Sequence, residues 1–358
     1  MKIVIVGAGV AGLATGWRMR QAGAEVTVLE RAQPARAATW AAAGMIAVAG
    51  EMGVAQTPEA EFAQHSAALW PDFAREVEAA SGRPVFYRRS GALMVARTPA
   101  EAAAFEGWSG VERLDAAGAR AKEPMLTGDI MGALWAPDEA QVDSRALGVA
   151  LASAFVGAGG VLNINEAAVR FDVADGRVLA VHSPFHRYEA DAFVIAAGAW
   201  SGRFGGLPDG VLPAVRPVKG EVISIAPPAG AALPEHVVWG NQVYLVPRGG
   251  RLLIGATMAE AGFDTGVTDA AADWLSLRAI GLMPALARWE VDERWAGLRP
   301  ASPDGLPVLG RTRLEGLFVA SGQFRNGILF APAVAETMSR LVLEHAAENP
   351  AFDPRRFP

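Results

Sequence analysis

The chain opens with a strand, a glycine-rich turn, a helix and a second strand within its first 30 residues. Residues 2–6 are an apolar run typical of a buried strand, residues 10–21 have the character of a helix, and residues 25–30 (EVTVLE) indicate another strand. A strand–helix–strand unit this short is the usual opening of a doubly wound sheet. The sequence therefore predicts an α/β fold built on a parallel sheet.

The turn after the first strand has the pattern GxGxxG, formed by Gly7, Gly9 and Gly12. In this pattern the first glycine allows a tight turn, the second lets a pyrophosphate approach the backbone, and the third lets the helix pack on the sheet. The helix N-terminus then faces the phosphates with its partial positive charge. Glu30 ends the second strand 18 residues after Gly12, where an acid hydrogen-bonds an adenosine ribose. This unit predicts a bound dinucleotide without distinguishing NAD from FAD; a glycine turn that binds nothing is the alternative.

Segments of two kinds alternate along the chain. Residues 1–82, 142–215 and 296–358 have α/β character, whereas residues 83–141 and 216–295 are rich in predicted strands. The alternation predicts two discontinuous domains, one doubly wound and one α+β with an antiparallel or mixed sheet. We expect a ligand site where they meet.

Two local patterns lie in the strand-rich segments. Residues 85–89 (VFYRR) predict a strand, and residues 242–258 (QVYLVPRGGRLLIGATM) predict a hairpin with its turn at Gly249-Gly250. A two-residue turn places Tyr244 opposite Gly255. By the alternation of side chains along a strand, Met258 would then face away from Tyr244 unless a bulge intervenes.

Composition excludes several kinds of site and partner. The chain has no cysteine, which excludes disulfides, thiolate nucleophiles, cysteine-ligated metals and a flavin attached through cysteine. Its 32 basic and 38 acidic side chains give a net charge of −6, which argues against nucleic acid and anionic membranes as partners. His182 and His186 are separated by Ser183-Pro184, which breaks a helix, so we expect no metal site.

The N-terminal apolar stretch does not suit a membrane or export segment. No apolar run reaches the length of about 18 residues that a membrane span needs. The spaced glycines and the acids Glu25 and Glu30 fit a folded unit better than a signal peptide. We expect a cytoplasmic protein.

One arginine is isolated from acids in residues 295–310 (WAGLRPASPDGLPVLG). Arg299 lies among apolar, glycine and proline residues, and Asp304 is the only acid of the stretch. A buried guanidinium without a partner is costly. Either Arg299 points into water or a ligand supplies an anion to it.

Residues 320–332 (ASGQFRNGILFAP) predict a strand, a glycine turn and the start of a final helix over 327–344, with Pro332 in its first turn. The N–H groups of Asn326, Gly327 and Ile328 would then point at an anionic group. A reduced flavin carries negative charge around N1 and the C2 carbonyl, which a helix N-terminus stabilises. The segment favours FAD over NAD; an ordinary closing helix is the alternative.

Eight motifs occur in order and carry a resemblance to a known family. They are GAGVAG with Glu30, TWAAAGM (39–45), VIAAGAWS (194–201), PVKGE (217–221), YLVPR (244–248), GATM (255–258), WAGLRP…DGLPVLG (295–310) and GQFRNGILFAP (322–332). Together they resemble the glycine oxidase branch of the FAD-dependent D-amino acid oxidase family, over residues 1 to 345. The resemblance implies a glutathione-reductase-like FAD-binding domain, noncovalent FAD and a homo-oligomer.

The resemblance also implies roles for single residues. Arg299 would bind the α-carboxylate of the substrate, Tyr244 would hydrogen-bond the same carboxylate, and Arg325 would lie beside it. The substrate carboxylate would then be the anion that Arg299 lacks in its own segment. The cofactor contacts would fall on Gly7, Gly9, Val10, Ala11, Gly12, Glu30, Arg31, Ala38, Thr39, Ala43, Gly44, Met45, Val169, Gly198, Gln323, Phe324, Arg325, Asn326, Gly327, Ile328 and Leu329.

Three residues match positions near the substrate: Met45, Gln242 and Met258. Core packing is the alternative for the two methionines. Related enzymes carry a histidine in place of Gln242, and residues 46–60 also differ from them in composition. Both departures bear on the choice of substrate more than on the class of reaction.

The implied activity is oxidation of glycine, sarcosine or D-alanine by hydride transfer to flavin N5. The imino acid hydrolyses to a keto acid and ammonia, O2 is reduced to H2O2, and iminoglycine would feed thiamine thiazole synthesis. No histidine, serine triad or carboxylate pair suggests itself as a general base. Two alternatives stay open: a D-amino acid dehydrogenase that uses a quinone or carrier, and a flavin-bearing subunit of a hetero-oligomeric amine dehydrogenase.

Overall fold

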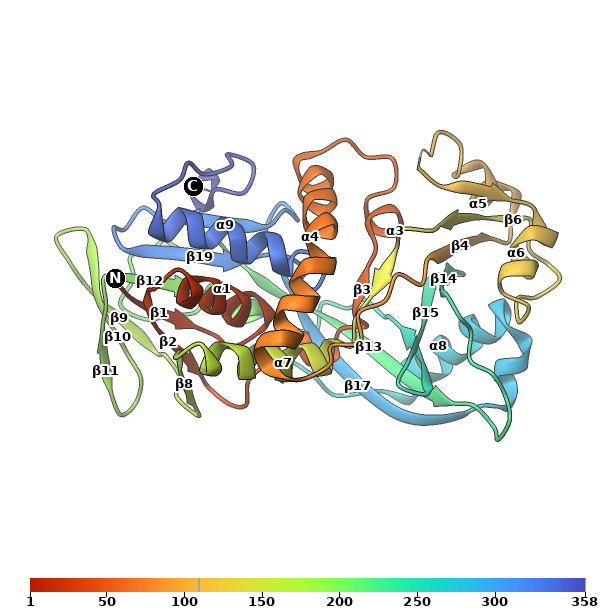
Figure 1. The fold of residues 1–358 in the computed structure, drawn as a ribbon, viewed down its shortest axis with the longest axis horizontal. Helices are drawn as coiled ribbons and strands as arrows, with labels where there is room; N and C mark the ends of the chain where they lie inside the picture. Colours follow the sequence, from red (N-terminus) through yellow and green to blue (C-terminus); the bar gives the residue numbers. More distant parts are fainter. Residues whose placement is uncertain (109, 358) are drawn as a thin grey trace.

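The computed structural model describes residues 1–108 and 110–357. Two large sheets lie at opposite ends of the molecule, and both chain termini lie at the end that carries β1 and β19 (Figure 1). The long strands β13 and β17 run from one end toward the other (Figure 1).

A six-stranded sheet with the order β18-β19-β12-β1-β2-β8 forms one end. All its strands run parallel except β18, which pairs antiparallel with β19. The strands are β1 (Lys2–Val6), β2 (Glu25–Glu30), β8 (Val161–Ile164), β12 (Ala192–Ile195), β18 (Val308–Arg311) and β19 (Leu317–Ser321). The predicted opening unit and the parallel sheet are confirmed.

Both faces of this sheet are covered, which explains why its strands are apolar throughout. Ile3 and Ile5 of β1 pack into a core with the helices α1, α7 and α9. Val4 and Val6 point the other way, into a core shared with a three-stranded antiparallel sheet. That small sheet has the order β11-β10-β9, with β9 (Arg170–Ala174), β10 (Arg177–His182) and β11 (Arg187–Glu189).

An eight-stranded sheet with the order β17-β13-β16-β15-β14-β4-β6-β5 forms the other end. Its pairs are antiparallel apart from β14 and β4, so the expected mixed sheet is confirmed. The strands are β4 (Ala92–Ala96), β5 (Glu112–Leu114), β6 (Gly132–Ala136), β13 (Arg216–Ala226), β14 (Val237–Gly240), β15 (Val243–Arg248), β16 (Arg251–Gly255) and β17 (Glu290–Ala301). A two-stranded ribbon joins β3 (Met45–Ile46) to β7 (Ala140–Gln141).

Helices cover the sheets and connect them. The α-helices of the described residues are α1 (Val10–Gln21), α2 (Ala38–Ala41), α3 (Val48–Met52), α4 (Pro58–Ser81), α5 (Pro99–Ala103), α6 (Ala116–Lys122), α7 (Ser144–Gly157), α8 (Asp269–Leu282) and α9 (Ala331–Leu343). Three 3-10 helices are η1 (Gly198–Trp200), η2 (Pro284–Arg288) and η3 (Pro354–Arg356). Within the described part of the chain, no helix is both long enough and apolar enough to cross a membrane.

Two local predictions are wrong. Residues 85–89 form no strand, because Phe86 has a φ of 56° and only Arg88 pairs, through an isolated bridge to Gln141. The last helix begins at Ala331, four positions later than predicted, since Pro332 occupies its first turn and residues 327–330 form turns before it.

The division into two domains at the predicted boundaries stays a prediction. β13 begins at Arg216, where the second strand-rich segment was expected to start. β17 runs without interruption across the boundary expected between residues 295 and 296. This strand therefore leads from the eight-stranded sheet toward the parallel sheet.

Candidate functional site

A cavity of about 600 Å³ lies between the two large sheets. At one end, the glycine-turn end, its wall includes Gly7, Gly9 and Glu30. At the other, the arginine end, it includes Glu51, Tyr244, Arg299 and Arg325. Of the predicted residues, those that line the cavity are Gly7, Gly9, Val10, Ala11, Glu30, Arg31, Ala38, Thr39, Ala43, Gly44, Met45, Gly198, Gln242, Tyr244, Met258, Arg299, Gln323, Phe324, Arg325, Asn326, Gly327 and Ile328.

Three predicted residues do not line the cavity. Gly12 lies behind the turn, where a Cβ would come within 2.0 Å of the Gly7 carbonyl oxygen, so it serves packing. Leu329 turns its carbonyl to Ser66 and Trp70, whose Oγ and Nε1 donate to it at 2.7 and 2.9 Å. Val169 is exposed, and its neighbour Ala168 lines the cavity instead.

The glycine turn is shaped by close contacts with the sheet and with α2. Gly7 has a φ of 109°, and a Cβ there would lie 2.4 Å from the Ala196 carbonyl oxygen, so only glycine fits. At Gly9 a Cβ would meet only the Thr39 hydroxyl, at 3.5 Å, which leaves the turn open toward the cavity. Gly9 has no side chain to cap α1, and the Thr39 hydroxyl accepts the Val10 N–H instead, at 2.9 Å.

Glu30 is held by the backbone around it. One carboxylate oxygen accepts the N–H of Ala8 at 2.9 Å and the other that of Ala32 at 3.1 Å. Next to it, the Arg31 guanidinium stacks on Trp200, 3.5 Å from the ring centroid. Trp200 and Arg203 also line the cavity and were not predicted; Trp200 stands two positions after Gly198 in VIAAGAWS, a signal that could have identified it.

The turn before α9 offers donors to the cavity. The Asn326 N–H is not among them, because it donates to the Gln323 carbonyl at 2.8 Å, contrary to the prediction. Within the described residues, the N–H groups of Gly327 and Ile328 donate to no protein acceptor. The buried Nε2 of Gln323 likewise has no partner there. These donors are available to an anionic or carbonyl-bearing ligand.

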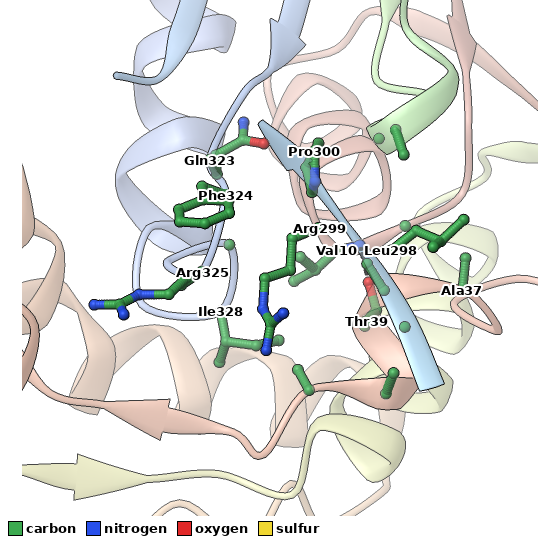
Figure 2. Close-up of a pocket in the computed structure, with 18 of the residues that line it drawn as sticks. Val10, Ala37, Thr39, Leu298, Arg299, Pro300, Gln323, Phe324, Arg325 and Ile328 are labelled. Carbon is green, nitrogen blue, oxygen red and sulfur yellow. Dashed lines mark hydrogen bonds between the residues drawn. The ribbon is translucent and has the colours of Figure 1, made fainter. Parts of the chain in front are cut away.

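Arg299 extends from β17 into the cavity (Figure 2). Its Nη1 donates to the carbonyls of Lys219 and Thr257 at 3.3 and 3.2 Å, and within the described residues no carboxylate lies at ion-pair distance from it. On the neighbouring strand β13, a Cβ at Gly220 would lie 2.2 Å from Nη1, so glycine makes room for the guanidinium. Burial lowers the pKa of Arg299, and the nearby Arg325 charge acts in the same direction.

Tyr244 lies on β15 opposite Gly255 of β16, as the hairpin predicted. A Cβ on Gly255 would lie 2.3 Å from the Tyr244 hydroxyl oxygen, so the phenol occupies the space above this glycine. Burial raises the pKa of Tyr244, which keeps the hydroxyl protonated as a donor. Trp239 packs edge-on against the same ring and also lines the cavity.

The side chains of Arg325 and Arg299 point in different directions. Figure 2 shows the Arg325 side chain directed away from Arg299, and its Nη2 pairs with the Glu51 carboxylate of α3. Glu51 is buried, and burial raises the pKa of its carboxyl, although Arg325 opposes that effect. Glu51 was not predicted; it lies within residues 46–60, whose divergent composition was the only signal.

Gln242 and Met258 both line the cavity. Met258 is 60% exposed and lies at the rim. The expectation that it faces away from Tyr244 does not apply, because β16 ends at Gly255 and the alternation of side chains ends with it. Met45, at the start of β3, also lines the cavity.

Comparison with known proteins agrees with this fold. Glycine oxidase of Geobacillus kaustophilus is 34% identical, over 98% of this chain and 94% of that protein, and its crystal structure superposes with a TM-score of 0.92 over 99% of this chain and 98% of that one. Bifunctional protein ThiO/ThiG of Synechocystis sp. is 35% identical over 99% of this chain and 54% of that protein. This chain thus spans about half the length of the bifunctional relatives that it matches.

The family of FAD dependent oxidoreductases matches residues 2–341. This match covers nearly the whole chain, and the expected resemblance is confirmed. The chain belongs to the FAD dependent oxidoreductase (DAO) family.

Proposed function

We propose that this chain oxidises a small amino acid, with glycine as the first candidate, and uses FAD as its cofactor. The observation that carries the proposal is Arg299: a guanidinium that faces the cavity, is held by two backbone carbonyls and has no carboxylate partner among the described residues. A substrate carboxylate would supply that partner. Glycine is favoured because the relatives that match nearly end to end are glycine oxidases.

FAD suits the donors on the cavity wall. Gln323 Nε2 is buried without a partner in the described chain, the N–H groups of Gly327 and Ile328 are unused, and the turn at Gly9 is open toward the cavity. Gly9 and the start of α1 would hold the pyrophosphate, Glu30 the ribose, and residues 323–328 the flavin ring. When bound, FAD supplies the acceptor for the hydride that leaves the substrate Cα. Binding is noncovalent in this proposal, and the absence of cysteine excludes attachment of FAD through a cysteine thiol.

The chain's own residues bind and orient the substrate. The Arg299 guanidinium would form a charge-assisted pair with the carboxylate, which fixes position and direction together. The protonated Tyr244 hydroxyl would donate to the same carboxylate. Arg325 adds positive charge to this end, and Glu51 balances part of it.

Neither cavity acid is free to act as a base. Glu30 accepts two backbone N–H groups, and Glu51 pairs with Arg325. The substrate would therefore react as the free amine, and the residues named above serve to position it. In the net reaction, glycine, O2 and water give glyoxylate, ammonia and H2O2.

Use of the imine before hydrolysis is a second part of the proposal. The similarity to half of a bifunctional protein favours a product that a second activity consumes, and supply of iminoglycine for thiamine thiazole synthesis is the use implied by the family resemblance. A cytoplasmic location and self-association stay predictions. A quinone-linked D-amino acid dehydrogenase and a subunit of a larger amine dehydrogenase are the competing assignments.

Anaerobic mixing of the FAD-loaded protein with glycine, sarcosine or D-alanine tests the proposal through bleaching of the flavin absorbance. We expect rapid bleaching with at least one substrate, loss of it in Arg299→Ala, and no change in Arg75→Ala, which removes an exposed guanidinium on α4. An oxidised flavin with all three substrates would contradict the small-amino-acid assignment. H2O2 formation in air separates an oxidase from a dehydrogenase, and slow turnover with copurifying proteins would favour a subunit of a larger enzyme.

A further inference from the structure

Glu139 is a buried acid on the loop between β6 and β7, and only 6% of its surface is exposed. One carboxyl oxygen, Oε1, accepts the N–H of Ala49 at 2.6 Å. The other, Oε2, is buried without a partner among the described residues. No step of the proposed reaction uses this group, so its burial needs another reason.

The partner of Glu139 is the first turn of α3, a helix of five residues. The residue before it, Ala47, has no side-chain acceptor, so the N–H groups of the first turn need one from elsewhere. Glu139 provides it from 90 positions away in the sequence, and the N–H groups of Val48 and Gly50 also act on its carboxyl. So short a helix depends on such outside contacts for its stability.

α3 contacts the arginine end of the cavity at two places. Glu51 lines the cavity and pairs with Arg325. Gly50 lies against Trp239, where an added Cβ would be 3.2 Å from the indole, and Trp239 lines the cavity as well. A shift of α3 would therefore move the Glu51 charge and remove the contact that supports the Trp239 side chain of β14.

We propose that Glu139 is a positioning residue: its carboxyl holds the first turn of α3 and so keeps Glu51 and Trp239 in place at the arginine end. The catalytic consequence rests on the proposed function, because it assumes that the substrate binds at this end. The structural part, that Glu139 holds α3, does not depend on any substrate.

The surroundings of Glu139 make this contact sensitive to protonation. Burial raises its pKa to about 7, although the three N–H groups oppose the rise, and the Glu51 charge adds to it. Asp138, on the same loop, pairs with the exposed Arg89. The apolar cluster into which Ala49 packs contributes no titratable group; its members are Met94, Leu134, Ala136, Phe105, Trp108, Val111 and Trp239.

The direction of the pH effect follows from linkage. If the pKa is about 7 while α3 is docked and near 4.5 once Glu139 is hydrated, the docked state binds the proton more tightly. Docking is then strongest below pH 4.5 and weakens as the pH rises from 4.5 to 7, the range between the two pKa values. Opening of α3 should become about tenfold more favourable between pH 6 and pH 8.

Hydrogen exchange of the peptide spanning residues 47–53 in the FAD-loaded protein tests the proposal, with rates corrected for the intrinsic effect of pH. Glu139→Ala removes the acceptor, and protection should fall about fivefold to thirtyfold at pH 6. Glu139→Gln keeps a neutral acceptor, so protection should be retained and lose the decline that the wild-type protein shows between pH 6 and pH 8.

A matched control is Glu123→Ala. Glu123 is another buried acid that accepts backbone N–H groups, those of Glu235 and His236, and its pKa is raised to about 6 by burial. The Glu123→Ala substitution should leave the exchange protection of residues 47–53 unchanged. Unchanged protection in Glu139→Ala, an equal loss in Glu123→Ala, or the wild-type pH decline in Glu139→Gln would each overturn the proposal.

The kinetic readout separates positioning from a merely structural role. Glu139→Ala should raise KM for glycine severalfold with little change in kcat. Glu139→Gln should restore KM and remove the increase in KM that the wild-type protein shows between pH 6 and pH 8. A kcat loss with unchanged KM would overturn the positioning role. If the wild-type protein does not oxidise glycine at all, the proposed function fails, while the exchange measurement still decides whether Glu139 holds α3.

Discussion

The glycine-turn end and the arginine end of the cavity differ in how far apart along the chain their residues lie. Gly7, Gly9 and Glu30 belong to one stretch of 30 residues, joined by neighbouring strands and one helix. At the arginine end, Glu51 meets Arg325 across 274 positions, and Tyr244 and Arg299 come from separate strands of another sheet. Local spacing therefore describes the first end, whereas the second is created by tertiary packing.

The largest effect should come from Arg299→Ala, which removes the guanidinium that faces the cavity from β17. Truncating one partner of a buried charge pair costs about 2–5 kcal/mol, so kcat/KM for glycine should fall by at least about thirtyfold. Arg299→Lys should recover only part of this, because an ammonium lacks the planar pair of donors. A kcat/KM within threefold of wild type in Arg299→Ala would show that the arginine end does not bind the carboxylate.

Gly220→Ala tests whether the space beside Arg299 matters as much as its charge. The added Cβ would lie 2.2 Å from Nη1, so the guanidinium must shift. We expect a loss of about 1–3 kcal/mol in the free energy of unfolding together with a raised KM. Gly128→Ala is the matched control, since a Cβ there meets nothing within 4 Å. Equal effects of the two variants would contradict the role given to Gly220.

The pH dependence of stability should reside largely in buried carboxyls away from the glycine turn. The folded-state pKa is raised by burial to about 7 for Glu139 and about 6 for Glu123, from 4.5. The folded protein therefore binds these protons more tightly, and its stability falls as the pH rises from 4.5 to 7. At pH 8, Glu139→Gln should be more stable than wild type by up to about 3 kcal/mol. Denaturant unfolding at pH 5 and pH 8 measures this, and a larger gain at pH 5 would contradict the sign.

The smallest effect concerns a contact that makes the glycine-turn end less local than its motif suggests. Thr39 caps α1 from 29 positions beyond Val10. Thr39→Val should weaken FAD binding by about 1 kcal/mol, roughly fivefold in Kd, by loss of the cap, whereas Thr39→Ser should keep it. Flavin fluorescence titration measures this. If Thr39→Val binds FAD as tightly as wild type, the glycine-turn end is as self-contained as its sequence suggests.

The predictions from the sequence divide in the same way as the two ends of the cavity: they succeeded where residues close together in the chain fix a position. Gly7, Gly9 and Glu30, which were predicted as cofactor contacts, all lie on the cavity wall, because strand, turn and helix within one unit fix them. Tyr244 lies opposite Gly255 as predicted, because a two-residue turn sets the register. In each case the contacts that decide the position are only a few residues away.

Predictions failed where distant contacts decide the structure. α3 is too short to show a helical period, and its partner Glu139 is 90 positions away, so neither Glu51 nor Glu139 could be placed. The start of α9 was misplaced because the turns over residues 327–330 have the composition of a helix and only Pro332 marks the true first turn. Arg325 lines the cavity and its place beside the carboxylate stays a prediction, whereas its pairing with Glu51 could not be predicted because it depends on how α3 folds.

The course of β17 is relevant to how ligands enter and leave the cavity. Its pairing with β13 runs from Glu290 to Ala301, and beyond Arg299 its end joins the flavin-side turn, where the Phe324 N–H donates to Pro300 at 3.0 Å. In the proposed function, the arginine that would bind the carboxylate and the turn that would hold the flavin ring are therefore connected through one continuous strand. Because β17 pairs with β13 along this length, we expect ligands to enter and leave by movement of segments at the rim of the cavity, such as the one that bears Met258.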